Sequence, residues 1–290
     1  MPKHICLLIH SLMRDGSPEP LAHRELFIRI NDVERMIMSL RDRGYRFVLP
    51  MNAGNVLDPT CSVTFDDGYY NNTYFLDIAE KYNVPFIVFV NSYNIIHQTP
   101  FIWDIWEKMG KNGRIIANDY EEMYNSLRPE EKRDLLKCDI HRPFTVEELE
   151  DFVSHPLCHL APHTHTHQTL IGRHAKKLDS ELEKNISFLS VFQRCLLDDF
   201  SLPCGLHSPA IRRKILKRFK RIYTIDGGEF SLKDRIIGRI SLVSPDMEGD
   251  LLFQIQRSFR WRSRLLRKSL TIFYSNPIFN RIALGREEVF

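Results

Sequence analysis

An apolar, β-like stretch at residues 61–65 runs directly into two adjacent carboxylates, in the sequence T-F-D-D-G-Y at residues 64–69. Neighbouring side chains of a regular strand point to opposite faces, so an Asp-Asp pair fits poorly inside one. We therefore expect the pair at the end of a strand, where the chain turns. Almost a hundred residues later the chain carries a second run of ionisable side chains, H-T-H-T-H at residues 163–167. A fold that joins these two segments would create a divided metal site.

The residue types of the two runs suit a divalent ion. Catalytic zinc sites commonly use three imidazole or carboxylate ligands and leave one position open. Asp67, His163 and His167 would supply such a set. The two histidines are four residues apart, which on a helical turn places them on one face, so we predict a helical turn here. His165 would then point away, toward a supporting or surface position. The ligand types favour Zn²⁺ and are also compatible with cobalt, nickel or iron.

Taken alone, each run has an ordinary interpretation, because Asp-Asp-Gly is common in turns. Together and in this order, the T-F-D-D-G-Y and H-T-x-T-H-x-x-L runs resemble the signature of polysaccharide deacetylases of the NodB-homology type. The resemblance extends in weaker form over residues 4–243, through the L-I-H-S run at 8–11, the F-S-L-P-C-G run at 200–205 and Arg239-Ile240. It implies an α/β fold, a distorted (β/α) barrel.

The resemblance also implies the roles of the residues. Asp66 would be the general base, with Asp67, His163 and His167 as the metal ligands. The metal would polarise an amide carbonyl and lower the pKa of a bound water while Asp66 takes the proton. Four residues of the first and third motifs are expected beside the substrate: Tyr69, Pro203, Cys204 and Gly205. A backbone N–H of the Gly68-Tyr69 turn would be a donor to the oxyanion.

Two departures from the family pattern affect this mechanism. Where many members carry an arginine two residues before the proline of the third motif, this chain has Ser201, so the usual partner of the catalytic Asp is missing. No Leu-x-His motif follows residue 207, which leaves the general acid unassigned. His10 and His207 are the candidates, because strand ends of a barrel converge on one face. The alternative to an enzyme is a catalytically impaired relative that binds glycans or acts as a scaffold.

Composition limits the class of protein. The chain has 290 residues, 43% hydrophobic and 27% charged, as in ordinary soluble globular proteins. We find no secretory signal and no apolar run of membrane-spanning length. The six cysteines are scattered without a C-x-x-C pair, which fits a reduced compartment. We expect a cytoplasmic protein.

Alternating apolar and amphipathic segments indicate a βα-type fold. We predict strands at residues 5–9, 46–50, 61–65 and 84–91, and helices at residues 31–43, 71–82 and 179–192. The barrel domain would span residues 1–250, with a helical insertion at about 101–143 that is charged and helix-prone between 119 and 137. Phe101, Trp103 and Trp106, at its start, would either line a sugar-binding face or pack against the insertion.

Two basic segments follow. Residues 212–221 hold seven Lys or Arg and predict an amphipathic helix. The extension at residues 251–290 is also basic, with aromatic residues interleaved, and would either contact an anionic membrane surface or dock on the barrel. A net charge of +3 and the lack of a recognisable module argue against nucleic acid. We therefore expect an N-deacylase that acts on an amino sugar in glycan biosynthesis. The first candidate is an N-deacetylase, and a deformylase is its nearest variant. The sugar would be free, nucleotide-linked or lipid-linked, and a lipid-linked sugar would be processed at the inner face of the membrane.

Overall fold

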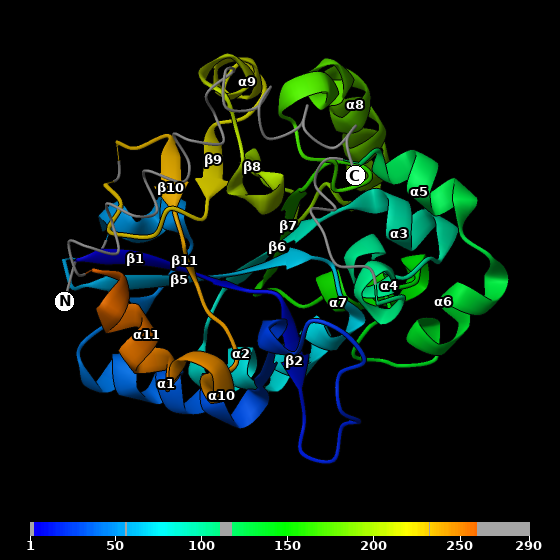
Figure 1. The fold of residues 1–290 in the computed structure, drawn as a ribbon. Coiled ribbons are helices and arrows are strands. Elements are labelled where there is room, and N and C mark those ends of the chain that lie inside the picture. The colour runs from blue at the N-terminus through cyan, green and yellow to red at the C-terminus, as the bar shows by residue number, and fades with distance from the viewer. Residues whose placement is uncertain (1–2, 56, 111–117, 232, 260–290) are drawn as a thin grey trace.

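The computed structural model describes residues 3–55, 57–110, 118–231 and 233–259 (Figure 1). Its strands are β1 His4–Ile9, β2 Ser11–Met13, β3 Phe27–Arg29, β4 Arg46–Phe47, β5 Thr60–Asp67, β6 Phe86–Val90, β7 Cys158–Pro162, β8 Asp199–Ser201, β9 Arg221–Thr224, β10 Ile236–Gly238 and β11 Ile240–Ser241. Its α-helices are α1 Ile30–Asp42, α2 Leu76–Tyr82, α3 Ser92–His97, α4 Ile102–Lys108, α5 Tyr120–Ser126, α6 Pro129–Leu136, α7 Val146–Val153, α8 Leu178–Leu189, α9 Pro209–Ile215, α10 Pro245–Glu248 and α11 Leu251–Ser258.

All strand pairings within the sheets are parallel, as expected for alternating strands and helices. The larger sheet has the order β11-β1-β5-β6-β7, with β4 paired to the start of β5, and a smaller sheet has the order β10-β9-β8. The sheets meet where Leu160 of β7 bridges to Leu196, just before β8. They meet again where β10 leads through Arg239 into β11. This arrangement confirms the predicted α/β fold and brings the carboxyl ends of the strands together.

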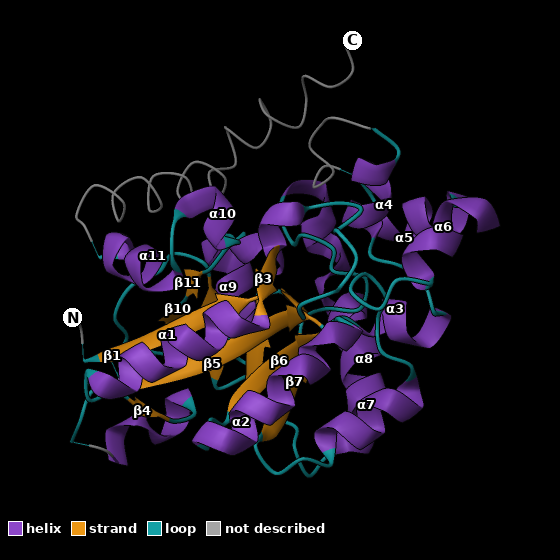
Figure 2. Cartoon of the chain, turned by 90° about the horizontal axis from the view of Figure 1, so that it is seen from below, coloured by secondary structure: helices purple, strands orange, loops and turns teal. Residues whose placement is uncertain are grey.

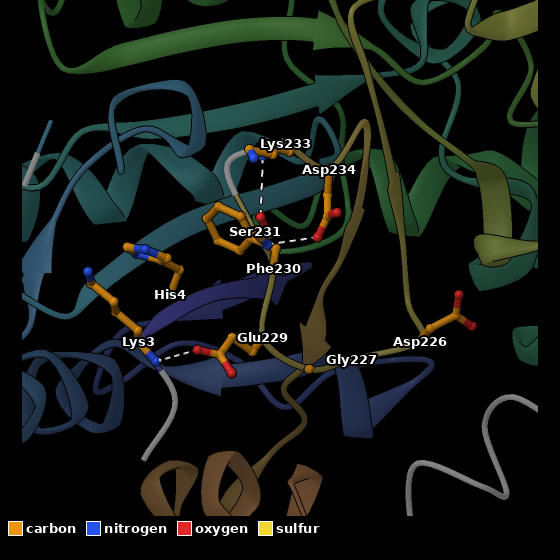
Figure 3. A pocket seen from close by; sticks show the side chains of 10 residues that line it. Lys3, His4, Asp226, Gly227, Glu229, Phe230, Ser231, Lys233 and Asp234 are labelled. Atoms are coloured by element: carbon orange, nitrogen blue, oxygen red, sulfur yellow. Dashed lines mark hydrogen bonds between the residues drawn. The ribbon is translucent and has the colours of Figure 1, made fainter. Parts of the chain in front are cut away.

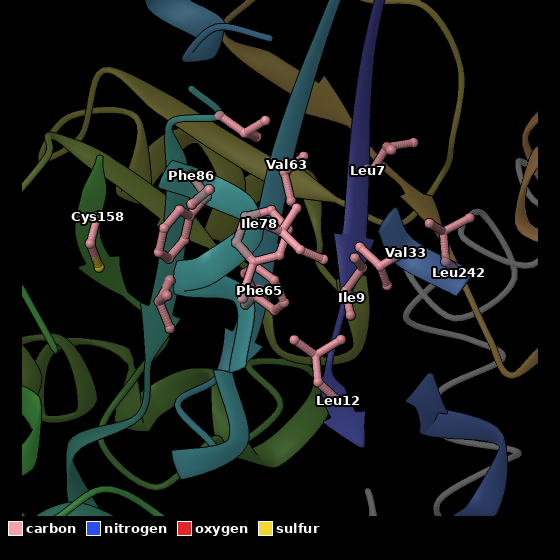
Figure 4. Packing of buried hydrophobic residues seen from close by; sticks show 14 of the residues in the cluster. Leu7, Ile9, Leu12, Val33, Val63, Phe65, Ile78, Phe86, Cys158 and Leu242 are labelled. Atoms are coloured by element: carbon pink, nitrogen blue, oxygen red, sulfur yellow. The ribbon is translucent and has the colours of Figure 1, made fainter. Parts of the chain in front are cut away.

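Alternate residues of the central strands enter two separate cores. Val63 and Phe65 of β5 and Val88 of β6 belong to an outer core formed with α1, α2, α7 and α11 (Figures 2 and 4). Ile87 and Phe89 belong to an inner cluster with Cys6, Tyr223 and Ile237. Because β6 is buried on both faces, its sequence is a continuous apolar run. The inner face of each strand therefore points toward the other sheet, and its last residues lie near the candidate site.

The predicted strands at residues 5–9, 61–65 and 84–91 and the helices at 31–43 and 179–192 are present, the last of them ending in a 3₁₀ turn at Ser190–Phe192. Three other predictions, the strand at 46–50 and the helices at 71–82 and 212–221, were too long. The strand predicted at 46–50 contains only Arg46 and Phe47. The Val48 N–H still pairs with the Cys61 carbonyl, but Pro50 has no N–H to donate, so the pairing cannot continue. In its place Pro50–Asn55 forms a 3₁₀ helix.

The helix predicted at residues 71–82 begins only at Leu76, after a 3₁₀ segment at Tyr70–Phe75. Two asparagines in that segment bind other parts of the chain. Asn71 Nδ2 donates to the Ile140 carbonyl at 2.7 Å and its Oδ1 accepts the Leu12 N–H at 2.8 Å. Asn72 Nδ2 donates to the His10 carbonyl at 2.9 Å. These side chains fix the end of β1 instead of extending the helix.

The helix predicted at residues 212–221 is also shorter in the structure. Ser208 caps α9, which ends at Ile215, and Arg221 already begins β9. The Arg235 guanidinium donates to the carbonyls of Leu216, Phe219 and Lys220, which satisfies backbone acceptors beyond the helix end.

In the predicted extension, Leu251–Ser258 form α11, whose Leu251 and Ile255 enter the outer core. The rest of that extension, residues 260–290, lies outside the described residues. Within the described residues, no helix combines the length and apolar character needed to cross a membrane.

Candidate active site

The Asp-Asp pair ends β5, and the backbone there lets both carboxylates face one site. Thr64 and Asp66 lie on the inner face of the strand, where both contact Arg239. Regular alternation would turn Asp67 to the other face. Asp67 instead has a φ of 77°, and Gly68 follows with a φ of 84°. This left-handed turn allows Asp67 to join the inner-face residues, as predicted for a pair at a strand end.

The histidine segment follows β7 as a loop, so the predicted helical turn is wrong. Thr164 and His167 have φ values of 67° and 63°, which a helix does not allow. Glu181 of α8 accepts both the N–H and the hydroxyl of Thr166 at 2.8 Å. His165 is buried and its Nδ1 lies 2.8 Å from Ser92 Oγ, so it supports the loop and does not take the surface position allowed by the sequence. The two outer histidines converge because the loop is fixed by α8 and α3.

Asp67, His163 and His167 form the set of ligands predicted for a metal. Their ligand atoms all lie within 4.8 Å of one another and all three residues are buried. His163 Nε2 lies 3.6 Å and His167 Nε2 3.4 Å from Asp67 Oδ1. His163 Nδ1 lies 2.9 Å from the Ser201 carbonyl, which requires a proton on Nδ1 and leaves the Nε2 lone pair toward the site. Among the described residues, Asp67 Oδ1 has no hydrogen-bond donor. These observations fit a bound divalent cation.

The electrostatics favour the same conclusion. Burial and the neighbouring Asp66 raise the pKa of Asp67 well above its usual range. Burial lowers the pKa values of His163 and His167, so both rings are neutral near pH 7 and able to act as ligands. A cation between the three residues would keep Asp67 ionised and compensate its burial.

Asp66 is held by Arg239, a functional residue that the sequence interpretation missed. Arg239 Nη1 donates to Asp66 Oδ1 and Nη2 to Asp66 Oδ2, both at 2.6 Å. Both side chains are almost fully buried. Burial alone would raise the pKa of Asp66, but the charge and hydrogen bonds of Arg239 outweigh it and hold that pKa well below its usual range. Asp66 is therefore an ionised carboxylate, as a general base must be.

The expectation that the catalytic Asp lacks its arginine is therefore wrong. Ser201 stands at the position of the family's arginine on β8, and its hydroxyl donates to Asp66 Oδ2 at 3.1 Å and accepts from Arg239 Nη2 at 2.7 Å. The guanidinium reaches the same carboxylate from the link between β10 and β11. Arg239 also lies over the Phe89 ring, at 5.2 Å from its centroid. In the sequence, Arg239 belongs only to the weaker part of the resemblance and has no assigned role, because its partner is 173 residues away.

The two candidates for the general acid differ in their surroundings. His10 directly follows β1 and continues the alternate residues of that strand that face the inner side of the sheet. Its Nδ1 is buried with no hydrogen-bond partner among the described residues. It interacts electrostatically with Asp66, and burial lowers its pKa to about 4. His207 is also buried, and its Nδ1 lies 3.2 Å from the Gly205 carbonyl of its own turn. Of the two histidines, His10 is the one that interacts electrostatically with the Asp pair.

Residues 203–205, predicted to lie beside the substrate, form a 3₁₀ turn after β8. Cys204 has a φ of 53° and Gly205 one of 65°, and a Cβ on Gly205 would lie 2.4 Å from an Ile225 side-chain carbon. Burial, together with Asp67 and Asp66, raises the pKa of the Cys204 thiol to about 12. The thiol is therefore protonated near neutral pH, which argues against a nucleophilic role.

Tyr69, also predicted as a substrate contact, is fully buried and connects the Asp loop to the helical segment at α4. Its hydroxyl donates to Asp104 Oδ2 at 3.2 Å and accepts from Trp103 Nε1 at 2.8 Å. His141 Nε2 accepts the Leu21 N–H, so Nδ1 of that ring carries the proton. Asp104 Oδ2 also accepts from this Nδ1 at 3.0 Å. Only the backbone of Tyr69 remains available for a role at the substrate.

Two of the three aromatic residues at the start of the insertion, Phe101 and Trp103, pack inward. Phe101 stacks on the Trp103 ring at a centroid distance of 5.2 Å, and the Trp103 ring lies 4.6 Å from the ring of His167, a candidate metal ligand. With Tyr120 and Tyr124 of α5 they form a separate apolar cluster. Trp106 is half-buried. The insertion therefore forms one wall of the candidate site.

A hollow at the amino-terminal end of β1 is unrelated to this site (Figure 3). Lys3, His4, residues 226–231, Lys233 and Asp234 line it, and the Lys3 backbone N–H donates to Glu229 Oε1 there at 2.7 Å. His4 begins β1 and His10 follows its end. The length of the strand, roughly 20 Å, separates the hollow from the Asp pair.

Comparison with known proteins places the chain in a family. A family model described as polysaccharide deacetylase matches residues 53–218, more than half of the chain. No match was found among curated proteins. Among solved structures, the chain is similar to IcaB from Ammonifex degensii, with 18% identity, a TM-score of 0.60 and coverage of 88% of this chain and 98% of that one.

Two further solved structures are similar. The deacetylase PplD from Streptococcus pyogenes has 16% identity and a TM-score of 0.57, over 88% of this chain and 99% of that one. A de-N-acetylase from Aggregatibacter actinomycetemcomitans has 17% identity and a TM-score of 0.57, over 83% and 95%. These likenesses support the fold, and the match of the family model covers both motifs of the site. The chain therefore belongs to the polysaccharide deacetylase family, hydrolases that act on carbon–nitrogen bonds other than peptide bonds.

Proposed function

We propose that the protein is a metal-dependent N-deacylase that removes an acyl group, in the first instance acetyl, from the nitrogen of an amino sugar in glycan biosynthesis. The observation that carries the proposal is that two adjacent carboxylates have different surroundings. Asp66 is ionised and held by two hydrogen bonds from Arg239, while Asp67 lies with His163 and His167 in a set suited to a cation. Such a pair supplies a base and a metal ligand side by side.

The metal, when bound by Asp67, His163 and His167, would polarise the acyl carbonyl and lower the pKa of a water molecule, and zinc is the ion that we propose. Asp66 takes the proton from the attacking water. Arg239 and Ser201 hold the Asp66 carboxylate in position for this transfer. A backbone N–H of the Gly68-Tyr69 turn is proposed as a donor to the oxyanion, and Pro203, Cys204 and Gly205 as the opposite wall of the substrate site.

We propose His10 as the group that passes a proton to the leaving amine. Its ring is neutral near pH 7, because burial lowers its pKa to about 4. It must therefore receive a proton during turnover before it donates one, and the neighbouring Asp66 carboxyl is the proposed source. If His10 has this role, His10→Gln lowers kcat strongly while His207→Gln does not, and the reverse result would reassign the role to His207.

The alternative, a catalytically impaired protein that binds glycans, depended on the missing arginine and the unassigned acid. Arg239 removes the first of these reasons. The substrate is proposed to be a free, nucleotide-linked or lipid-linked amino sugar, and the location to be the cytoplasm, at the inner face of the membrane if the sugar is lipid-linked. Membrane contact through residues 251–290 stays a prediction, because most of that segment lies outside the described residues.

The test is release of acetate and formate from a panel of N-acylated amino sugars, with purified protein of known metal content. We expect release that stops after chelation, returns when metal is added and is lost in Asp66→Asn, which still binds metal. Asp77→Asn is the matched control, because the Asp77 side chain is 85% exposed in a surface ion pair. Bound metal without release from any panel member would contradict the proposed activity on these substrates.

A further inference from the structure

Asn91 is a buried side chain whose polar atoms have no partner. The residue is fully buried, and neither Oδ1 nor Nδ2 of its carboxamide has a hydrogen-bond partner among the described residues. Both atoms lose their hydrogen bonds to water on folding, which is unfavourable unless another group replaces them. Asn91 is the N-cap residue of α3, yet its side chain makes no capping hydrogen bond. The carboxamide is thus not used for the role that asparagine usually has at this position.

The backbone determines the face of the sheet on which this side chain lies. Along β6, Val88 and Val90 enter the outer core, whereas Ile87 and Phe89 enter the inner cluster. Asn91 has a φ of −89° and a ψ of 122°, so the extended conformation continues through it. Its side chain therefore lies on the same face as Phe89. That is the face on which Arg239 stacks and binds Asp66.

The register of the sheet places Asn91 between the two halves of the site. Phe89 pairs with Asp66 on one side and with Ala161 on the other. Asn91 lies two residues beyond Phe89, as His163 lies two residues beyond Ala161, and the His163 N–H donates to the Val90 carbonyl at 3.1 Å. On the other side of β6, Asp67 pairs with Val90, so the next residue of each strand brings Asn91 beside Gly68, which has no side chain. The carboxamide therefore lies one layer above Asp66, between its strand and that of His163.

Other polar atoms without partners gather at the same end of the strands. Asp67 is the last residue of β5, Thr164 follows β7 and His10 follows β1. Asp67 Oδ1, Thr164 Oγ1 and His10 Nδ1 have no hydrogen-bond partner within the described part of the chain. The carboxyl ends of parallel strands meet at one edge of a sheet, so these atoms belong to one polar region. A group bound in this region would find both a donor and an acceptor on Asn91.

Given the proposed function, on which this inference rests, we propose that the Asn91 carboxamide binds the N-acyl amide of the substrate. An acylated amine carries one N–H donor and one carbonyl acceptor, and a carboxamide offers the complementary pair. The deacylated amine has no carbonyl to match it. Asn91 would thus be a specificity-determining residue that distinguishes acylated from free amino sugars.

Asn94 provides the matched comparison, because it is a second fully buried asparagine only three residues away. Its Nδ2 donates to the Pro100 carbonyl at 3.0 Å and lies 3.0 Å from Tyr124 Oη. A structural asparagine satisfied in this way is destabilised by replacement with leucine, which has a similar size and no polar atoms. An unsatisfied one kept for ligand binding is stabilised or unaffected by the same change.

The experiment compares Asn91→Leu and Asn94→Leu in the metal-loaded protein. We expect Asn91→Leu to melt at or above the wild-type temperature and Asn94→Leu to melt below it. In an Asp66→Asn background, which does not turn over, we expect Asn91→Leu to weaken binding of N-acetylglucosamine 10- to 100-fold by calorimetry and to leave glucosamine binding unchanged. With Asp66 intact, kcat/KM falls by a similar factor on the substrate that the panel identifies.

Several results would overturn the assignment. A lower melting temperature for Asn91→Leu would make the residue structural. An unchanged ratio of acylated to free sugar affinity would show that the carboxamide does not contact the acyl group, even if the panel confirms deacylation. Absence of turnover in the wild type would contradict the proposed function instead, and the binding comparison would still decide the role of Asn91.

Discussion

Replacing Arg239 by methionine tests whether the buried guanidinium supports Asp66 as the contacts indicate. The Arg239 and Asp66 side chains are 0% and 4% exposed and joined by two hydrogen bonds of 2.6 Å. Removing one partner of such a pair leaves the other charge buried and uncompensated, which costs about 3–5 kcal/mol. We therefore expect Arg239→Met to lower the free energy of unfolding by about that amount.

Asp66→Asn leaves the Arg239 charge uncompensated in the same way, whereas the double variant removes both charges. The combined loss should consequently be smaller than the sum of the single losses, by at least about 2 kcal/mol. Urea denaturation at pH 7 in the presence of a chelator measures all four proteins without a contribution from bound metal. Arg46→Met is the control, because Arg46 pairs with Asp58 at the surface, where such pairs contribute about 0–1 kcal/mol.

Additivity of the two single changes to within about 0.5 kcal/mol would refute the reasoning, since independent sites add to that accuracy. Arg239→Lys gives a further check. Lysine keeps the charge but cannot donate the two parallel hydrogen bonds. We expect it to recover part of the stability and little of the turnover.

Three further predictions concern the surroundings of the site. Asp104→Ala removes the acceptor shared by Tyr69 and His141, so kcat should fall at least tenfold while the three candidate metal ligands remain, measured by kinetics and metal titration. Burial lowers the pKa of His165 to about 4, below its unfolded value of about 6.5. As pH falls, His165 of the unfolded chain therefore binds its proton before His165 of the folded chain does, so metal-free protein should lose stability from about pH 6.5 toward pH 4. The loss should be less steep in His165→Gln. A pH-independent free energy of unfolding would contradict this. The Cys204 thiol, with its pKa raised to about 12, should resist iodoacetamide at pH 8, and Cys204→Ala should remain active; rapid labelling detected by mass spectrometry would contradict this.

The sequence was informative where the chemistry is local. The Asp pair, its place at a strand end and the two outer histidines could all be predicted, because each motif lies on a few consecutive residues. The conformation of the histidine loop could not be predicted, since a spacing of four also fits a loop with two left-handed residues at Thr164 and His167. The helix predicted at 71–82 was placed too early at its start for a related reason, because Asn71 and Asn72 have partners that are distant in sequence.

Residues that act through distant partners left no sequence signal. Arg239 meets Asp66 across 173 residues, and Ser201 at the expected position gave the misleading impression that the arginine was absent. Asp104 and His141 are separated by 37 residues and meet only because the insertion folds back on the Asp loop. Asn91 resembles any asparagine at the start of a helix until its lack of a partner is visible. Such residues are identified by register and burial, which spacing in one sequence does not determine.

The position of Arg239 has a consequence for when the protein becomes active during its synthesis. The arginine lies between β10 and β11, where the chain leaves the smaller sheet for the larger one. A chain that ends before residue 236 has already made the Asp pair and both histidines, but Asp66 has no buried cation to hold it ionised. Catalytic competence is therefore acquired last, when the final strands dock. A chain truncated in the connection from β9 to β10 would lack Arg239 and keep all three candidate metal ligands.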